Sequence, residues 1–247
     1  MLNKLNRAGS AVLSLYDDFK EFLSPSACLC CGRERDFPDL FLCPNCLEKL
    51  KIANIGDGPV CPLCGRPIGA VSPCDFCKNS NAPQLFFWGI YENELQECLI
   101  QFKFHRALEL GKNITLMALE PLHDRLLTSK YDLVIPIPLH KNRERERHYN
   151  QSQVISETVA SNLNIPHEAN ILLRKRHTQQ QAKLEENHRW ENVKDAFAVS
   201  DASVVRNLRI LLVDDIVTTG ATVYEAAKPL LRAGVAHLDI FSLAYAK

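Results

Sequence analysis

Eight of the ten cysteines in this chain fall into four Cys-x-x-Cys pairs, a residue type and spacing that bind soft metal ions. The pairs join Cys28 with Cys31, Cys43 with Cys46, Cys61 with Cys64, and Cys74 with Cys77. Each such turn points two thiolates at one centre, about 2.3 Å from a zinc ion, and two turns complete a tetrahedron. Pairing in sequence order therefore predicts about two zinc ions, one for each successive set of four cysteines. Four-sulfur zinc sites are closed, so we expect a structural rather than a catalytic role.

The spacing alone leaves three alternatives open: interleaved pairing of the turns, an iron–sulfur cluster, and a redox-active thiol pair. The short apolar run near residue 13 is interrupted by Asp17 and Asp18, so it is not a signal-peptide core. Regular cysteine pairs without a secretion signal favour metal binding in a reducing cytoplasm. No segment reaches the roughly 20 apolar residues that span a bilayer. Cys98 lies among apolar neighbours, and we expect it in the core.

A second pattern joins two acids to a turn rich in hydroxyl groups. An apolar run over residues 209–213 precedes Asp214 and Asp215, and Thr-Thr-Gly-Ala-Thr follows at 218–222. A buried strand would deliver both carboxylates to its carboxyl end, where open α/β sheets bind ligands. The turn then opens a helix, whose N–H groups and neighbouring hydroxyls form a phosphate cradle. Since adjacent acids repel bare phosphate, we expect them to accept ribose hydroxyls, directly or through Mg²⁺. The pattern predicts a site for 5-phosphorylated ribose.

Alternating apolar patterns predict the elements that position these groups. We expect strands at 86–91, 133–138, 171–173, 196–199, 209–213 and 238–244, and helices at 94–104, 108–127, 151–162 and 221–233. This alternation predicts an α/β fold with a parallel, doubly wound sheet flanked by helices. We expect an N-terminal helix at 1–26, a double zinc ribbon at 27–80 and the α/β domain at 84–247.

The segment from Ile210 to Thr222 resembles the phosphoribosyl-pyrophosphate (PRPP) motif of type I phosphoribosyltransferases. The resemblance implies that Asp214 and Asp215 hold the ribose. It assigns the 5-phosphate to Val217, Thr218, Thr219, Gly220, Ala221 and Thr222.

Further stretches and the cysteine module extend the likeness over most of the chain, to the ComF/GntX-type proteins of bacterial competence and DNA uptake. Pro136 to Leu139, with Pro136 and Pro138, is similar to that family's pyrophosphate loop. Arg174, Lys175 and Arg176 match its flexible loop. The stretch from Arg147 to Gln151 resembles its Arg-Gly-Phe-Asn-Gln, with His148 replacing a glycine and crowding an expected positive φ.

The resemblance implies a phosphoribosyltransferase fold that binds PRPP with Mg²⁺ in the cytoplasm, and a role in competence, DNA uptake or DNA utilisation. Transfer of ribose 5-phosphate to a nitrogen nucleophile would need no protein nucleophile, and none is evident. The chain has no net charge, so no global field draws it to nucleic acid or membrane. Residues 140–183 nevertheless hold eight Lys or Arg against four acids, so a polyanion can be met locally.

The competing interpretation is a non-catalytic accessory protein that binds single-stranded DNA and works with the DNA-uptake machinery. Basic loops at 141–147 and 174–176 would follow the phosphate backbone. Phe86, Phe87, Trp88 and Tyr149 are candidates for base stacking, although a core position is expected for the first three. Lys103 resembles a recurrent lysine of the family, and a solvated side chain at a helix end is the alternative.

Overall fold

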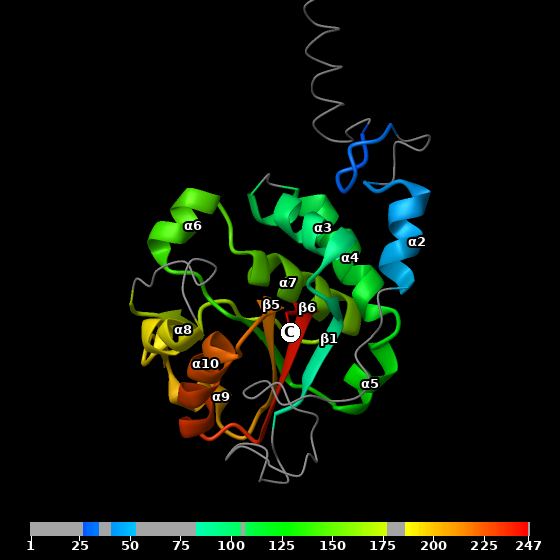
Figure 1. Ribbon diagram of the computed structural model, residues 1–247. Helices are drawn as coiled ribbons and strands as arrows, with labels where there is room; N and C mark the ends of the chain where they lie inside the picture. The colour runs from blue at the N-terminus through cyan, green and yellow to red at the C-terminus, as the bar shows by residue number, and fades with distance from the viewer. Residues whose placement is uncertain (1–26, 35–40, 53–82, 105–106, 177–185, 247) are drawn as a thin grey trace, which may run out of the picture. The chain divides into compact units, whose positions relative to one another are not determined.

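The computed structural model describes residues 27–34, 41–52, 83–104, 107–176 and 186–246 (Figure 1). The chain divides into two compact units, residues 1–52 and 53–247. The predicted helix at 1–26 and residues 177–185 lie outside the described residues. The same holds for the four later cysteines predicted as metal ligands, which are Cys61, Cys64, Cys74 and Cys77. The domain boundaries expected from the sequence remain a prediction.

The first unit is a short turn followed by a helix. Ala27 forms an antiparallel bridge with Glu34, and the Gly32 N–H donates to the Cys28 carbonyl at 2.8 Å. Gly32 has a φ of +70°, a conformation that glycine adopts without steric cost. Helix α2 spans Pro44–Ile52 and places Cys46 in its first turn. The turn and the helix start thus carry the first two cysteine pairs.

The second unit is built on a parallel four-stranded sheet with the order β1-β6-β5-β2. Its strands are β1 (Leu85–Ile90), β2 (Leu133–Pro136), β5 (Arg209–Val217) and β6 (His237–Tyr245). The two central strands are mostly apolar and mostly buried, as expected for strands that are covered on both faces. All four carboxyl ends therefore meet at one edge, where the predicted acids lie.

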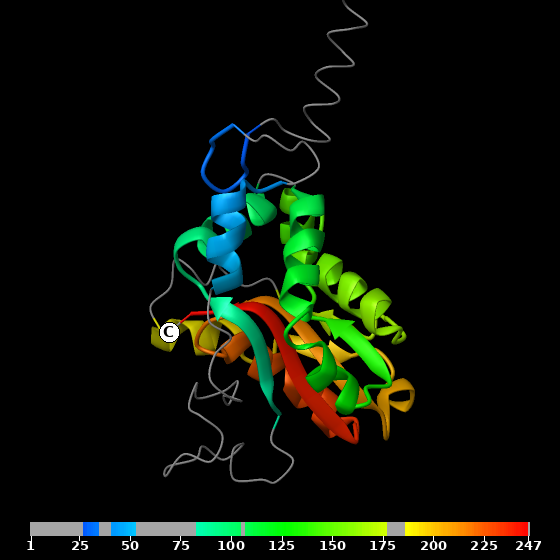
Figure 2. The same ribbon diagram turned by 90° about the vertical axis from the view of Figure 1, so that its right-hand side faces the viewer.

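Helices cover both faces of this sheet (Figure 2). The described helices of the unit are α3 (Asn93–Phe104), α4 (Leu108–Leu119), α5 (His123–Thr128), α6 (Lys141–Arg147), α7 (Gln151–Leu163), α8 (Glu186–Val193), α9 (Ala202–Val205) and α10 (Ala221–Arg232). Helices α4 and α7 pack on one face, and α10 packs on the other. The predicted fold class, a parallel sheet flanked by helices together with a cysteine module, is confirmed.

Two predicted strands do not join the main sheet. β3 (Leu172–Arg174) and β4 (Phe197–Val199) form a separate antiparallel pair. The reason lies at the outer edge of β2, where the Val134 N–H donates to the Pro166 carbonyl at 2.9 Å. The Glu168 N–H donates in turn to the Val134 carbonyl at 3.1 Å. Residues 166–168 thus occupy the edge before the chain reaches β3.

Most boundaries shift by one or two residues from the sequence-based prediction, helices α8 and α9 were not predicted, and three further differences have a physical reason. The helix expected at 108–127 is divided into α4 and α5, because Pro121 has no N–H to continue the hydrogen-bond ladder. The stretch at 141–147 is helix α6 rather than a loop, since lysine, arginine and glutamate all favour helix. Strand β5 continues past the apolar run to Val217, so both acids lie within the strand.

The core of this unit lies between the sheet and its helices, and it includes Cys98, which is fully buried as predicted. Phe86, Phe87 and Trp88 are also buried, which confirms their expected core position and removes them as stacking surfaces. Among the described helices, none is both long and apolar enough to cross a bilayer.

Candidate functional site

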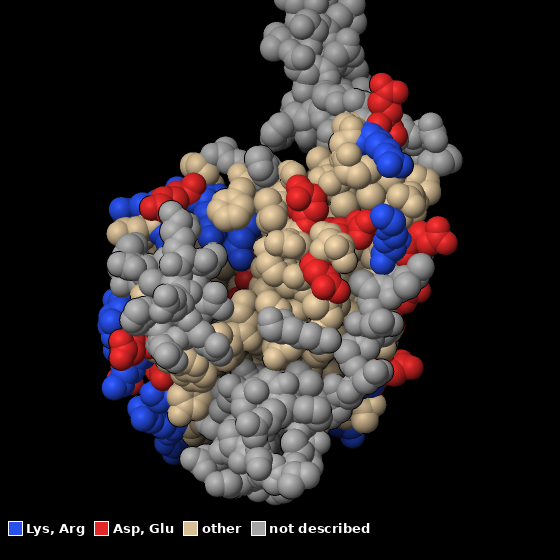
Figure 3. All heavy atoms as spheres, in the orientation of Figure 1, with Lys and Arg blue, Asp and Glu red and all other residues tan. Residues whose placement is uncertain are grey.

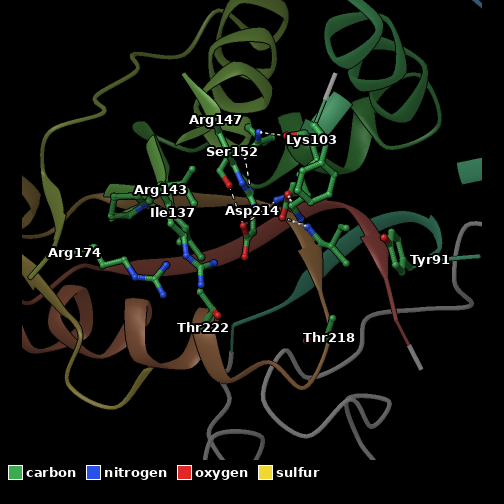
Figure 4. Close-up of a pocket in the computed structure, with 16 residues that line it drawn as sticks. Tyr91, Lys103, Ile137, Arg143, Arg147, Ser152, Arg174, Asp214, Thr218 and Thr222 are labelled. Carbon is green, nitrogen blue, oxygen red and sulfur yellow. Dashed lines mark hydrogen bonds and ion pairs between the residues drawn. The ribbon is translucent and has the colours of Figure 1, made fainter. Parts of the chain in front are cut away.

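A cavity of about 240 Å³ opens at the carboxyl edge of the sheet (Figure 4). Its wall comes from the ends of β1, β2 and β5, from α3, α6 and α7, and from the turn that begins α10. The ionisable side chains that carry its charge are Lys103, Arg143, Arg147, Arg174, Asp214 and Asp215. Four cations therefore face two carboxylates, and the cavity favours an anionic ligand.

Asp214 and Asp215 point to different partners from the same strand. The Asp214 carboxylate is 8% exposed and accepts the Ser152 hydroxyl at 2.9 Å and the Asp215 N–H at 2.9 Å. Burial, reinforced by the adjacent negative charge of Asp215, raises the pKa of Asp214 to about 7. Asp215 forms an ion pair with Lys103, with 2.7 Å between Oδ2 and Nζ. One acid is thus held by a neutral hydroxyl, and the other by a cation.

The start of α7 brings Ser152 to the acids. Asn150 caps this helix, since its side chain accepts the Ser152 N–H at 3.2 Å. The Asn150 amide also donates to the Ile137 carbonyl at 3.0 Å, which ties the segment after β2 to the helix start. His148 ends α6 with a φ of +70°, so the positive φ expected at this position is confirmed with histidine in place of glycine.

Three arginines supply most of the positive charge. Arg174, the last residue of β3, lies over the Phe197 ring at 5.1 Å, and burial lowers its pKa to about 10, so it stays charged at neutral pH. Arg143 and Arg147 come from α6, where Lys and Arg side chains gather on the surface (Figure 3). Lys175 and Arg176 are exposed and do not line the cavity. Of the three basic residues predicted for the flexible loop, Arg174, Lys175 and Arg176, only Arg174 lines the cavity.

The hydroxyl-rich turn at 218–222 lies where the sequence predicts it, between β5 and α10. Thr218 and Thr222 line the cavity, whereas Val217 is buried in the sheet. Gly220 caps α10 in the left-handed region with a φ of +76°, where a side chain would be strained. The Thr219 hydroxyl is buried and has no hydrogen-bond partner among the described residues, and Thr219 does not line the cavity. An unpaired buried hydroxyl beside a helix N-terminus retains a hydrogen-bond donor.

The predicted pyrophosphate loop begins in the sheet and continues along the wall of the cavity. Pro136 is the last residue of β2, and Pro138 lines the cavity together with its neighbours Ile137 and Leu139. Ala221 is the first residue of α10 and is buried. Asp214, Asp215, the hydroxyl-rich turn at 218–222 and Pro138 therefore lie at the same edge of the sheet, as predicted.

In the first unit, Cys28, Cys31, Cys43 and Cys46 form a cluster in which all four sulfur atoms lie within 4.8 Å of one another. Burial opposes ionisation of Cys28, yet N–H groups led by that of Cys43 lower its pKa to about 7. Burial and the neighbouring sulfur atoms raise the pKa of Cys46, because thiolates without a cation repel each other. This set could hold a metal ion, and it joins the pairs in sequence order.

The second predicted set of metal ligands is not part of this cluster. Cys61, Cys64, Cys74 and Cys77 all lie outside the described residues, so the second four-sulfur site stays a prediction. Of the eight cysteines predicted as ligands, the structure therefore brings together the first four.

Several lining residues were not singled out from the sequence. Ser152 and Arg143 lie on helices that follow β2, and Tyr91 and Phe104 lie at the ends of β1 and α3. A signal for Ser152 does exist. A helix that opens soon after a parallel strand starts at that strand's carboxyl edge, so its first residues face the ligand site.

The fold and the site define an α/β protein with a cavity lined by four basic and two acidic side chains at the carboxyl edge of its sheet, and a cysteine cluster in a separate unit. No protein-family model matches the chain. It is 30% identical to the DNA utilization protein YhgH of Escherichia coli over 225 residues, covering 89% of this chain and 96% of that protein. The corresponding protein of Salmonella typhi is 33% identical over 190 residues, covering 74% and 83%. Competence protein F of Haemophilus influenzae is 29% identical over 215 residues, covering 83% and 90%. The chain belongs to the ComF-type family of competence and DNA utilization proteins.

Among solved structures, the chain is similar to purine phosphoribosyltransferase from Pyrococcus horikoshii, with a TM-score of 0.36 and 15% identity over 53% of this chain and 73% of that one. Adenine phosphoribosyltransferase from Leishmania donovani gives a TM-score of 0.36 and 12% identity, covering 68% and 86%.

Proposed function

We propose that the cavity binds a 5-phosphorylated ribose of the PRPP class, and that this ligand underlies a role in competence or DNA utilisation. One observation carries the proposal: two carboxylates lie near the carboxyl end of the central strand β5, which is followed by a hydroxyl-rich turn that opens a helix. Four cations surround this pair in the same cavity. Each part suits a different piece of the ligand.

The phosphate would lie on the N–H groups that begin α10, where the helix dipole favours an anion by about 0.3–1 kcal/mol. Thr218 and Thr222 face that position, and the buried Thr219 hydroxyl has a donor to offer. The ribose hydroxyls would then donate to Asp214 and Asp215. These acids suit Mg²⁺ as well, because it prefers carboxylate oxygen and ligand phosphate, and the ion would neutralise the pyrophosphate.

Arg143 and Arg174 would face the pyrophosphate, since both guanidinium groups line the cavity from the side opposite Lys103 (Figure 4). Guanidinium groups bind phosphate oxygens in a bidentate fork. In a transfer reaction, a nitrogen nucleophile would form a bond to C1 of the ribose while the bond to pyrophosphate breaks. The chain's part would be to position both groups and to balance the leaving charge.

A second candidate function is binding of single-stranded DNA, and the rim of the cavity favours it. Phe104 is 56% exposed, and the Arg147 guanidinium lies over its ring at 5.3 Å. Bases stack on exposed aromatic and guanidinium planes. Tyr149 suits this less well than the sequence suggests, because its hydroxyl donates to the Phe102 carbonyl.

For the cysteine cluster we propose a structural zinc ion on four thiolates, with a second zinc expected on the later four cysteines. The first set is Cys28, Cys31, Cys43 and Cys46, and the second is Cys61, Cys64, Cys74 and Cys77. Structural zinc contributes folding free energy directly. Elemental analysis of reduced protein should find about two zinc ions per chain. An iron-rich preparation would instead support an iron–sulfur cluster on these cysteines.

Calorimetric titration with ribose 5-phosphate and with PRPP, in Mg²⁺, tests the cavity. Gly220→Ala should weaken binding of both ligands at least tenfold, because its Cβ enters the turn where the backbone approaches phosphate. The matched control is Gly234→Ala, since Gly234 also has a positive φ, +86°, and has room for a Cβ beyond the other end of α10. Both variants should lose roughly 1–2 kcal/mol of stability from backbone strain. If wild-type protein binds neither ligand at millimolar concentration but binds single-stranded DNA in a salt-dependent way, the second candidate is favoured.

A further inference from the structure

The Lys103 side chain extends from the end of α3 to the two acids at the carboxyl edge of the sheet. It lies in the last turn of α3, and its Nζ is 2.7 Å from the Asp215 Oδ2. The side chains of the two residues are only 20% and 14% exposed. A lysine that only extended into solvent from a helix end would have an exposed ammonium group with no acid beside it. The Lys103 side chain is instead largely buried, and its ammonium group is paired with Asp215.

The position of Lys103 is fixed by its neighbours. Phe102 is fully buried and its ring packs on that of Tyr149 at 5.8 Å between centroids. The Gln151 amide donates to the Lys103 carbonyl at 3.3 Å, and the Tyr149 hydroxyl donates to the Phe102 carbonyl. These contacts satisfy carbonyl groups at the end of α3.

The segment that makes these contacts is the one that opens α7. Its next residue, Ser152, donates to Asp214 at 2.9 Å. The same short stretch of chain thus places a cation against one acid and a hydroxyl against the other (Figure 4). The two partners of the acid pair are delivered together, so the arrangement is a built part of the site.

This arrangement changes the charge that an incoming ligand meets. Two bare carboxylates would repel the 5-phosphate, and a divalent cation is one way to remove that repulsion. The Lys103 ammonium already balances Asp215, and Asp214 is held by an uncharged donor. Hydroxyl groups of a ribose can therefore donate to this pair without a metal ion between them.

We propose that Lys103 is the resident counter-cation of the ribose half of the site, so that ribose 5-phosphate binds without a divalent ion. A divalent ion would then be needed only for a ligand that also carries pyrophosphate. This inference rests on the proposed ribose 5-phosphate site and assigns a positioning role to one lysine within it.

The test is calorimetric titration of the full chain with ribose 5-phosphate, in magnesium-free buffer without a chelator and in Mg²⁺. Wild-type affinity should differ by less than about threefold between the two buffers. Lys103→Met should lose about tenfold or more in magnesium-free buffer, the range for one charge-assisted contact, and should recover part of it in Mg²⁺. Lys103→Arg, which keeps the charge, should stay close to wild type in magnesium-free buffer.

The matched control is Lys112→Met, because Lys112 also pairs with an acid but lies half-exposed on α4 outside the cavity. It should bind like wild type in both buffers, and the melting temperature of each variant verifies folding. Wild-type binding that requires Mg²⁺, or Lys103→Met that matches wild type in magnesium-free buffer, would overturn the role of Lys103 alone. Absence of wild-type binding in both buffers would overturn the ribose 5-phosphate site and this inference with it.

Discussion

Two buried aspartates lie on adjacent strands of the same sheet, Asp214 toward the carboxyl end of β5 and Asp239 near the amino end of β6. Asp239 is 1% exposed and accepts the Tyr131 hydroxyl at 2.7 Å and the Gln84 N–H at 2.8 Å. It also lies 2.8 Å from the His237 Nε2. Asp214 has a hydroxyl and its neighbour's N–H, and it faces a cavity.

The difference separates a carboxylate that ties strands together from one that borders the cavity in which we propose that a ligand binds. The three groups around Asp239 come from before β1, from before β2 and from β6 itself, so they tie three strands together. Around Asp214, burial raises the pKa to about 7, which means that the folded protein disfavours the ionised form. A group that is costly to the fold and borders a cavity is a candidate for function.

Removal of Asp239 should have the largest effect on stability. Asp239→Ala leaves the buried Tyr131 hydroxyl and two partly buried groups, the Gln84 N–H and the His237 ring, without this partner, so we expect the free energy of unfolding to fall by about 3 kcal/mol. Urea denaturation measures the loss. The folded variant should bind ribose 5-phosphate like wild type, because the residue lies at the opposite end of the sheet. A loss below about 1 kcal/mol would show that this carboxylate does not hold the strands.

Asp214→Asn should show the reverse pattern. It keeps the shape but removes a charged acceptor, so affinity for ribose 5-phosphate should fall about tenfold or more. Stability should not fall, since the variant no longer buries a charge. Unchanged affinity would remove Asp214 from the proposed site.

The pH dependence of stability sharpens this contrast. The pKa of Asp214 is about 7 in the folded protein against an ordinary value of 3.8, so the folded state binds the proton more tightly. Between those values wild-type stability should decline as pH rises, and Asp214→Asn should lack that part of the decline. Unfolding free energies of both proteins from about pH 4 to about pH 8, in magnesium-free buffer without a chelator, measure the difference. Parallel profiles would contradict it.

The smallest effect on stability and on ligand affinity is expected at Arg176, whose recorded hydrogen bond is to a backbone carbonyl and to neither Asp214 nor Asp239. Its side chain is exposed and donates to the Lys194 carbonyl at 2.7 Å. Arg176→Ala should change stability by less than about 1 kcal/mol. Affinity for ribose 5-phosphate should be unchanged, whereas PRPP, which carries more charge, should bind a few-fold more weakly. Equal weakening for both ligands would place this arginine near the 5-phosphate instead.

How much the sequence predicts depends on how far apart the interacting residues lie along the chain. Asp214, Asp215 and the hydroxyl-rich turn at 218–222 occupy one continuous stretch, so the apolar run of β5 is enough to predict their place at the sheet edge. The pairing of Lys103 with Asp215 joins α3 to β5, and no local pattern contains it. The Asp239 network likewise depends on three segments that meet only in the folded sheet. Helix α6 differs from the prediction for another reason, because its basic composition suggests a loop whereas its lysine, arginine and glutamate residues favour helix.

The strand addition at β2 has a consequence for how copies of the protein behave in solution. An exposed sheet edge is a template for pairing with another chain, and aggregation often begins there. On this side the backbone of Val134 is already hydrogen-bonded to Pro166 and Glu168, and the strand ends in a proline that has no N–H to donate. The outer edge of β2 is thus closed to a further strand, and on that side the sheet that carries both acids of the cavity is protected from intermolecular pairing.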